Sequence, residues 1–253
     1  MASLRDLRRR IRDVGKIKQI TRAMQFVAAS KLKRAQDATL NARPYAEAID
    51  EVLADVAAVL SGEDHPLLGT PEKGKRLIVL FTSDRGLAGP FNTNTIRFVA
   101  RAITEHQGDL AVVAVGRKGR DALRRARVPI EAYFDGFGDR PSFADVVPLA
   151  RLVTDDYRSG GYERIDLVYS QFVSTLVQRP ALEQLLPRYV AQRLFQAVLE
   201  SKASEESSRM VAMRNATDNA DDLIDDYTLE YNKVRQTSIT REMIEIATGA
   251  QAR

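Results

Sequence analysis

The chain has 253 residues, 44% of them hydrophobic and 28% charged, with a formal net charge of +4, two histidines and no cysteine. This composition excludes a mainly disordered chain, and the lack of cysteine excludes disulfides, thiolate metal sites and thiol catalysis. No run approaches the ~18 to 20 consecutive apolar residues that cross a bilayer, so we expect any link to a membrane to run through a partner.

Residues 1–60 are predicted to form one long helix. Ser3 has the chemistry of an N-cap, and apolar residues keep helical spacing as far as Leu60, where a cluster of helix breakers begins. Pro44 is expected to kink or bend this helix, because proline lacks an amide donor and crowds the preceding turn. The first 43 residues hold 12 Lys or Arg against 3 Asp. We reject a targeting segment, because the helical pattern continues without a cleavage-like break and includes acidic residues.

The apolar residues of this first helix predict a seam for a partner helix. Two sets share a 3,4,3 spacing: Leu4, Leu7, Ile11 and Val14, and then, after one short step, Ile17, Ile20, Met24 and Val27. The short step is expected to rotate the stripe around the helix.

Residues 75–179 are predicted to form an α/β domain. Four apolar runs have the character of buried strands, and helical segments lie between them; the strands are expected at 76–82, 109–116, 128–134 and 164–172, and the helices at 92–106, 117–127 and 142–158. Continuous apolar strands separated by helices predict a parallel, Rossmann-like sheet covered on both faces. The segment from Gln178 to Tyr189 is expected to be a short connection.

Residues 188–253 are predicted to form a second long helix. They contain no proline and a single glycine, Gly249, and some 60 helical residues would extend roughly 90 Å. Its apolar stripe consists of Val190, Leu194 and Val198, followed by Leu223, Tyr227, Tyr231 and Val234. So long a helix needs a partner along its length. We therefore expect the two terminal helices to form an antiparallel coiled coil; an ordinary helical bundle would need further long helices.

Glycines and charged residues of the middle domain offer weak signals for chemistry. The loop Ser83–Asn94 contains neither GxGxxG nor a P-loop, and Pro90 removes an amide that a phosphate could use. Gly116–Gly119 begins a helix where an anion could bind, although glycines that shape a tight turn explain it better. Adjacent carboxylates such as Asp221 and Asp222 point in different directions on a helix and indicate solvated charge. We predict no catalytic residues, no cofactor and no metal site.

A nucleic-acid-binding protein is an alternative suggested by the basic first helix, since a basic region that continues into a coiled coil resembles the leucine-zipper plan. That plan needs a parallel dimer with sustained leucine heptads. Here the complementary helix lies at the far end of the same chain, beyond an α/β domain, so we expect no nucleic acid as a partner.

Four segments in the correct order resemble the gamma subunit of F-type ATP synthases, in a short bacterial form. They are KIKQITRAMQFVAASKLKRAQ (16–36), TSDRGLAGPFNTN (82–94), SRMVAMRNATDNADDLI (208–224) and LEYNKVRQTSITREMIEI (229–246). The resemblance implies a non-catalytic central stalk, present in one copy per complex, that transmits torque between a c-ring and a hexamer of alpha and beta subunits. ATP would then bind on the neighbouring subunits, and the coupling ion would be a proton or sodium.

The resemblance also implies partners and contact residues. The terminal helices would turn inside the hexamer, and the α/β domain would contact the epsilon subunit and the c-ring, at the cytoplasmic side of a bacterial plasma membrane. Met24 matches a methionine near the sliding contact with beta, Arg235 and Gln236 match a polar catch, and Arg241 and Ile244 stand at the predicted bearing near the tip.

Three departures from the family pattern leave alternatives open. Ala88 and Pro90 replace residues that are commonly Cys and Gly, Arg241 and Ile244 replace Gln and Thr, and many members have about thirty more residues before the last helix. A divergent paralogue with altered coupling, or a nucleotide-binding α/β protein with helical arms, are the competing interpretations.

Overall fold

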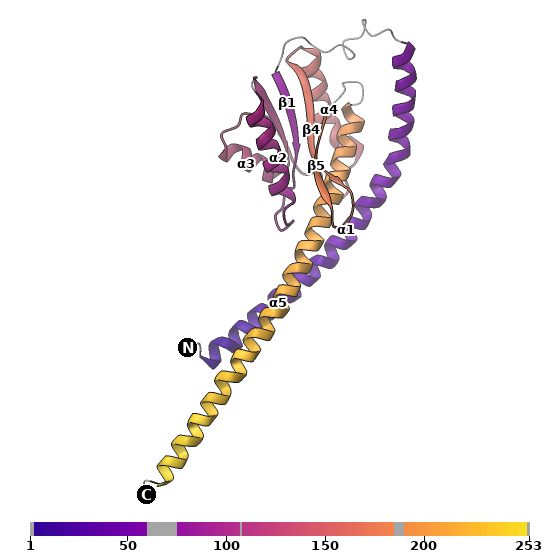
Figure 1. Cartoon of the computed structure of the whole chain (residues 1–253). Helices are drawn as coiled ribbons and strands as arrows, with labels where there is room; N and C mark the ends of the chain where they lie inside the picture. The colour runs from indigo at the N-terminus through magenta and orange to yellow at the C-terminus, as the bar shows by residue number, and fades with distance from the viewer. Residues whose placement is uncertain (1–2, 60–74, 107, 185–189, 252–253) are drawn as a thin grey trace. The chain divides into compact units, whose positions relative to one another are not determined.

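The computed structural model describes residues 3–59, 75–106, 108–184 and 190–251 (Figure 1). The chain forms two compact units. The α/β unit consists of Ala28–Met210, and the coiled-coil unit consists of Met1–Val27 together with Val211–Arg253. Two long helices, α1 (Leu4–Val59) and α5 (Val190–Gln251), contribute residues to both units.

The α/β unit is built on a five-stranded sheet with the order β3-β2-β1-β4-β5. Four strands run parallel, and their bounds are Lys75–Phe81 for β1, Leu110–Val115 for β2, Ile130–Phe134 for β3 and Tyr162–Phe172 for β4. All four predicted strands are therefore confirmed. The apolar runs of β1 and β2 are continuous because both faces of these strands are buried.

The fifth strand, β5 (Gln178–Gln184), corrects the sequence analysis, which expected a short connection from residue 178 onward. This strand pairs antiparallel with β4, with Tyr169 opposite Ala181. Antiparallel neighbours need only a short turn between them. The strand was not predicted because it is an edge strand. Its sequence mixes polar residues with Pro180 and does not resemble that of a buried strand. Residues 185–189 of the expected connection lie outside the described residues.

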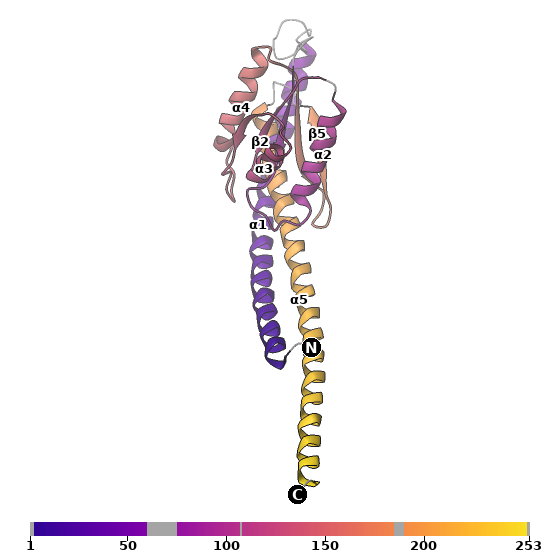
Figure 2. The same ribbon diagram turned by 90° about the vertical axis from the view of Figure 1, so that its left-hand side faces the viewer.

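Helices cover both faces of this sheet, as expected. On one face α2 (Phe91–Glu105) and α3 (Arg117–Arg125) bury Val99 and Leu123 against β1, β2 and β4. On the other face α4 (Phe143–Arg158) and the first turns of α5 bury Leu149 and Leu194 in a larger core. Figure 2 shows α2 and α4 on opposite sides of the sheet. Each large apolar side chain buried in this way stabilises the fold by about 1.5–3 kcal/mol.

The coiled-coil unit pairs the beginning of α1 with the second half of α5. Ser3 caps α1, since its Oγ accepts a hydrogen bond from the Asp6 amide at 3.2 Å. Arg8 donates to the Tyr231 hydroxyl at 2.9 Å, and the hydroxyls of Thr21 and Thr217 are 2.8 Å apart. Residue numbers that rise along α1 meet numbers that fall along α5, so the predicted antiparallel coiled coil is confirmed.

The rotation expected in the α1 stripe does not occur. The buried and half-buried positions continue in steps of 3 and 4 from Val14 to Lys18, Thr21 and Gln25. Of the predicted continuation, Ile17, Ile20 and Val27 are more than half exposed, and only Met24 is half-buried. A rotated stripe would need a matching rotation on α5, whose buried positions instead keep the heptad pattern. The partner helix, and not the hydrophobicity of α1 alone, therefore decides which face is buried.

A smaller expectation about α5 is also corrected. On α5 the half-buried Ile224 lies in the seam, whereas the predicted Leu223 is 44% exposed, because 224 and not 223 continues the heptad from Ala220 to Tyr227. On α1, Pro44 does not end the helix, which continues to Val59, and the bend expected there stays a prediction. A proline inside a helix removes one backbone hydrogen bond, and the remaining turns can keep the helix continuous.

Candidate functional site

The residues expected to contact a surrounding ring lie in the coiled-coil unit. Met24 is half-buried, Arg235, Gln236 and Arg241 are exposed, and Ile244 is 58% exposed. In the described part of the chain, the side chains of Arg235, Gln236 and Arg241 make no hydrogen bond or ion pair. These side chains are therefore available to a partner.

The structure places these residues in two groups along the coiled coil. Thr21 of α1 meets Thr217 of α5, so Met24 lies near that level. Arg235 follows one turn after Tyr231, which contacts Arg8 near the beginning of α1. About twenty residues of helix, or roughly 30 Å at 1.5 Å per residue, separate the two levels. A partner that touches both groups must therefore do so through separate segments or separate subunits.

The end of α5 has no helix beside it within the coiled-coil unit. Past Ser238 every residue as far as Thr248 is exposed, and the large apolar side chains among them are Ile239, Met243, Ile244 and Ile246. The pairing stops because α1 begins at Leu4, and Figure 1 shows α5 continuing past the start of α1. Exposed apolar residues gathered on one segment mark an interaction surface.

A second apolar surface on α1 was missed by the sequence analysis, which placed its residues in the seam. Ile17, Ile20 and Val27 lie on one side of the helix, and each is more than half exposed. Met24 borders this surface. The signal that could have found it is the unbroken heptad through Lys18, Thr21 and Gln25, which leaves the isoleucines outside. The coiled-coil unit thus offers apolar contacts on both helices.

Charged residues of the coiled-coil unit also pair across the seam. Lys18 forms an ion pair with Asp221, and the guanidinium groups of Arg8 and Arg10 lie 5.2 Å and 5.7 Å from the ring centres of Tyr231 and Tyr227. One acidic residue of α5, Asp221, and two of its tyrosines thus face basic residues of α1. These three basic side chains are engaged within the chain, which weakens the nucleic-acid alternative.

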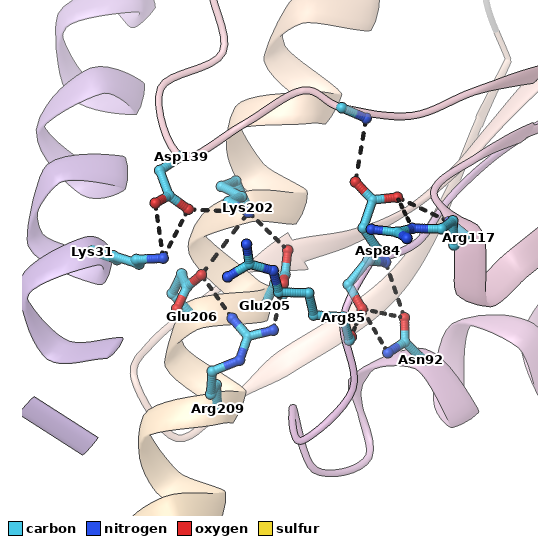
Figure 3. Close-up of polar contacts among 12 residues, drawn as sticks. Lys31, Asp84, Arg85, Asn92, Arg117, Asp139, Lys202, Glu205, Glu206 and Arg209 are labelled. Atoms are coloured by element: carbon cyan, nitrogen blue, oxygen red, sulfur yellow. Dashed lines mark hydrogen bonds and ion pairs between the residues drawn. The ribbon is translucent and has the colours of Figure 1, made fainter. Parts of the chain in front are cut away.

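The possible anion site at the start of α3 is filled by the chain itself. The Asp84 carboxylate accepts hydrogen bonds from the amides of Arg117 at 3.0 Å and Gly136 at 3.3 Å, as Figure 3 shows for Asp84 and Arg117. The Lys118 amide donates to the Ser83 carbonyl and the Gly119 amide to the Thr82 hydroxyl. A phosphate group would have to displace all of these partners, so the geometry disfavours a nucleotide at this helix start.

Gly116 confirms that this turn is shaped by close packing. Its φ is 94°, in the region that favours glycine, and a Cβ there would lie 2.1 Å from the Thr82 carbonyl oxygen. The glycine is required by the strand-to-helix turn and needs no ligand to explain it.

The described residues contain neither a membrane-spanning helix nor a metal-binding cluster. No helix among them has the length and apolar content to cross a bilayer, and no three His, Cys, Asp or Glu side chains converge on one point there.

Comparisons with known proteins identify the family. The family model described as ATP synthase matches residues 3–188 and 181–252. An ATP synthase gamma chain from Dehalococcoides mccartyi is 44% identical, with 100% of this chain and 99% of that protein aligned. The chain belongs to the ATP synthase gamma-chain family. Another gamma chain, from Pelotomaculum thermopropionicum, is 41% identical over the same shares.

Solved structures agree with this family. The central stalk and c-ring structure of the Tetrahymena thermophila mitochondrial ATP synthase contains a chain that is 26% identical, with a TM-score of 0.64, covering 78% of this chain and 99% of that one. A chain of the Euglena gracilis mitochondrial ATP synthase has a TM-score of 0.74 at 19% identity, covering 98% and 94%, and shows the shared fold. The two family matches overlap at residues 181–188.

Proposed function

We propose that the chain is the central rotor stalk of an ion-translocating ATP synthase and transmits torque between a c-ring and a hexamer of alpha and beta subunits. The observation that carries this proposal is the single, exposed end of α5 beyond an antiparallel coiled coil, in a chain of the gamma family. A lone helix with exposed Met243 and Ile246 needs a surrounding partner, and a ring of subunits supplies one on every side.

The physical basis of this function is asymmetry. One side of the coiled coil carries the apolar Ile17 and Ile20, whereas α5 carries the exposed carboxylates of Asp222, Asp225 and Asp226. Three chemically identical sites around such a shaft meet three different surfaces, so each is biased toward a different conformation. Rotation of the shaft moves this bias from site to site, and the chain needs no catalytic residue of its own.

We assign the contacts with the hexamer to the five residues predicted from sequence. Met24 and the neighbouring apolar surface of α1 form the sliding contact, Arg235 and Gln236 form the polar catch, and Arg241 and Ile244 form the bearing. Arginine suits a catch because its planar guanidinium can bind a carboxylate through two hydrogen bonds. Their exposure supports these roles.

The rotor proposal also implies partners for the α/β unit. The α/β unit contacts the c-ring and the epsilon subunit, and one copy of the chain serves each complex. The chain is then a peripheral protein at the cytoplasmic side of a bacterial plasma membrane, attached through the c-ring. The support is that the related Tetrahymena chain was solved in a central stalk with its c-ring.

The catch is tested by the double variant Arg235→Ala and Gln236→Ala in the assembled complex. We expect proton-driven ATP synthesis to fall by at least about fivefold, since a central polar contact of this kind is worth more than ~1 kcal/mol. The matched control is Arg214→Ala, an arginine on the same helix whose side chain is 72% exposed. Unchanged synthesis in the double variant would remove the catch assignment, and a complex that assembles and couples without this chain would overturn the rotor proposal.

A further inference from the structure

The two long helices are attached to the α/β unit in very different ways. At its start α5 contributes Val190, Leu194, Ala197 and Val198 to the main apolar core beneath the sheet. In the described part of α1 within this unit, the buried apolar residues that join a cluster are Leu32 and Ala35, which meet Ala203 of α5. Among the side chains that the structure describes, those of α5 therefore contribute more to the buried apolar core of this unit than those of α1.

A small apolar contact does not fix the position of a helix along its axis. Apolar attraction depends on the area that is buried and has no preferred direction. Small residues such as Ala35 and Ala203 present smooth surfaces that fit equally well after a small displacement. Directional contacts are needed if α1 is to move as one body with the α/β unit.

Asp139 provides such a contact. It lies in the loop between β3 and α4, and its two carboxylate oxygens accept from the Lys31 Nζ of α1 at 2.9 Å and 2.8 Å. The Lys202 Nζ of α5 lies 3.9 Å from the same carboxylate. Figure 3 shows both lysines pointing at Asp139 from different helices. The hydrogen bond from Lys31 to Asp139 thus joins α1 to the loop between β3 and α4.

The charges around Asp139 favour its ionised form. The hydrogen bond from Lys31 lowers the pKa of the Asp139 carboxyl below its usual range, and the charges of Lys31, Lys202 and Arg85 act in the same direction against the effect of burial. The carboxylate is therefore charged at neutral pH, and the Lys31 and Lys202 side chains are each about four-fifths buried.

Lys202 is itself held in place by acidic neighbours on α5. Its Nζ lies 3.2 Å from Glu205 and 3.9 Å from Glu206, and Arg209 pairs with both glutamates. Glu205, Glu206 and Arg209 are nearly buried, so their side chains cannot move freely. This row of charges fixes the α5 side of the contact with Asp139.

A pocket that is open to solvent lies beside Asp139. Its volume is about 320 Å³, and it lies between Arg34 and Asn41 of α1, the 139–141 loop, and Leu199 and Lys202 of α5. Side chains that interlock resist displacement, and none of those that the structure describes fills this space. The ionic contact of Asp139 therefore adds a directional restraint at this edge of α1.

We propose that Asp139, held between Lys31 and Lys202, is a positioning residue that locks α1 to the α/β unit and so lets torque reach both helices of the shaft. This inference rests on the proposed rotor function. Without the lock, α1 shifts under load while α5 follows the sheet, and part of the rotation is lost as strain between the two helices.

The test compares coupling in the assembled complex, measured as ion pumping per ATP hydrolysed in inverted vesicles. Asp139→Asn keeps the size of the side chain and removes its charge, and we expect coupling to fall about twofold, as suits one partly exposed ion pair. Lys31→Met removes the other partner, keeps the apolar stem, and should have the same effect. The double variant should be no worse than Asp139→Asn alone, because Asp139→Asn already removes the ionic contact that Lys31→Met removes.

Two controls separate a positioning role from a general loss of stability. Asp139→Glu retains the charge and should retain coupling. Asp109→Asn changes an exposed carboxylate without a side-chain partner in the described residues and should change nothing. If the Asp139→Asn complex couples as well as the wild-type complex, this inference is overturned. The rotor proposal is then unaffected, because the wild-type complex is still coupled. A complex that lacks this chain and still pumps as well as the wild-type complex would overturn the rotor proposal.

Discussion

The α/β unit and the coiled-coil unit use their apolar residues in opposite ways. In the α/β unit the strands and the start of α5 direct them inward, and Leu77, Leu167 and Leu194 are fully buried. In the coiled-coil unit the seam contains Thr21 and Thr217, while Ile17 and Ile20 face outward. The first arrangement maximises burial within one chain. The second gives up burial within the chain and offers apolar surface to partners, as a shaft inside a ring requires.

The two units should also differ in how they respond to substitutions. A substitution in the α/β core should act on folding, because many neighbours lose contacts at once. A substitution on the outer faces of the coiled coil should act on assembly and coupling. The following predictions test this difference, beginning with the largest effect.

The core of the α/β unit should be the most sensitive region. Leu194→Ala removes a fully buried side chain from the main core, and we expect a loss of about 2–5 kcal/mol in the free energy of unfolding. Chemical denaturation of the full chain measures this loss. Leu229→Ala is the control, since Leu229 is 70% exposed on α5 and should change stability by less than about 0.5 kcal/mol. Equal effects from the two would mean that burial does not distinguish the units.

The polar seam should respond in a non-additive way. Thr21→Val alone breaks the hydroxyl contact with Thr217 and should cost up to about 1 kcal/mol. Adding Thr217→Val replaces both polar groups by apolar ones of similar shape, and the double variant should be as stable as the wild type or more stable. Thermal unfolding of the three variants measures the coupling between the two positions. If the two losses simply add, the threonines do not form one contact across the seam.

The smallest effect should come from pH acting on Asp139. Its folded-state pKa is lowered, so the unfolded chain binds a proton more readily than the folded one. The stabilisation is therefore complete above the unfolded pKa of about 4 and is lost as pH falls through the lower folded pKa. The stability difference between the wild type and Asp139→Asn should be largest near neutral pH and shrink below about pH 4. A difference that grows in acid would contradict the direction of this pKa shift.

Much of the fold was accessible from sequence because it depends on local pattern. Continuous apolar runs marked β1 and β2, and Ser3 marked the start of α1 through its capping chemistry. The edge strand β5 was not accessible. An edge strand with one exposed side lacks the continuous apolar run, and only its pairing with β4 identifies it.

The candidate site was only partly accessible. The exposed end of α5 follows from unequal helix lengths, and Arg235 and Gln236 were named through a family resemblance. The apolar surface containing Ile17 and Ile20 was assigned to the wrong side of the helix. The contacts of Asp139 could not be predicted from the sequence, because its two lysine partners lie 108 residues before it and 63 residues after it in the chain.

The sequence by itself determined the helices and the four parallel strands, because capping, breakers and apolar periodicity act between neighbours along the chain. Only the tertiary structure decided which face of α1 is buried, where β5 pairs, and which charges meet at Asp139. These features depend on the position of a second element. The free energy of burial or of an ion pair is set by both partners, and a single segment contains only one of them.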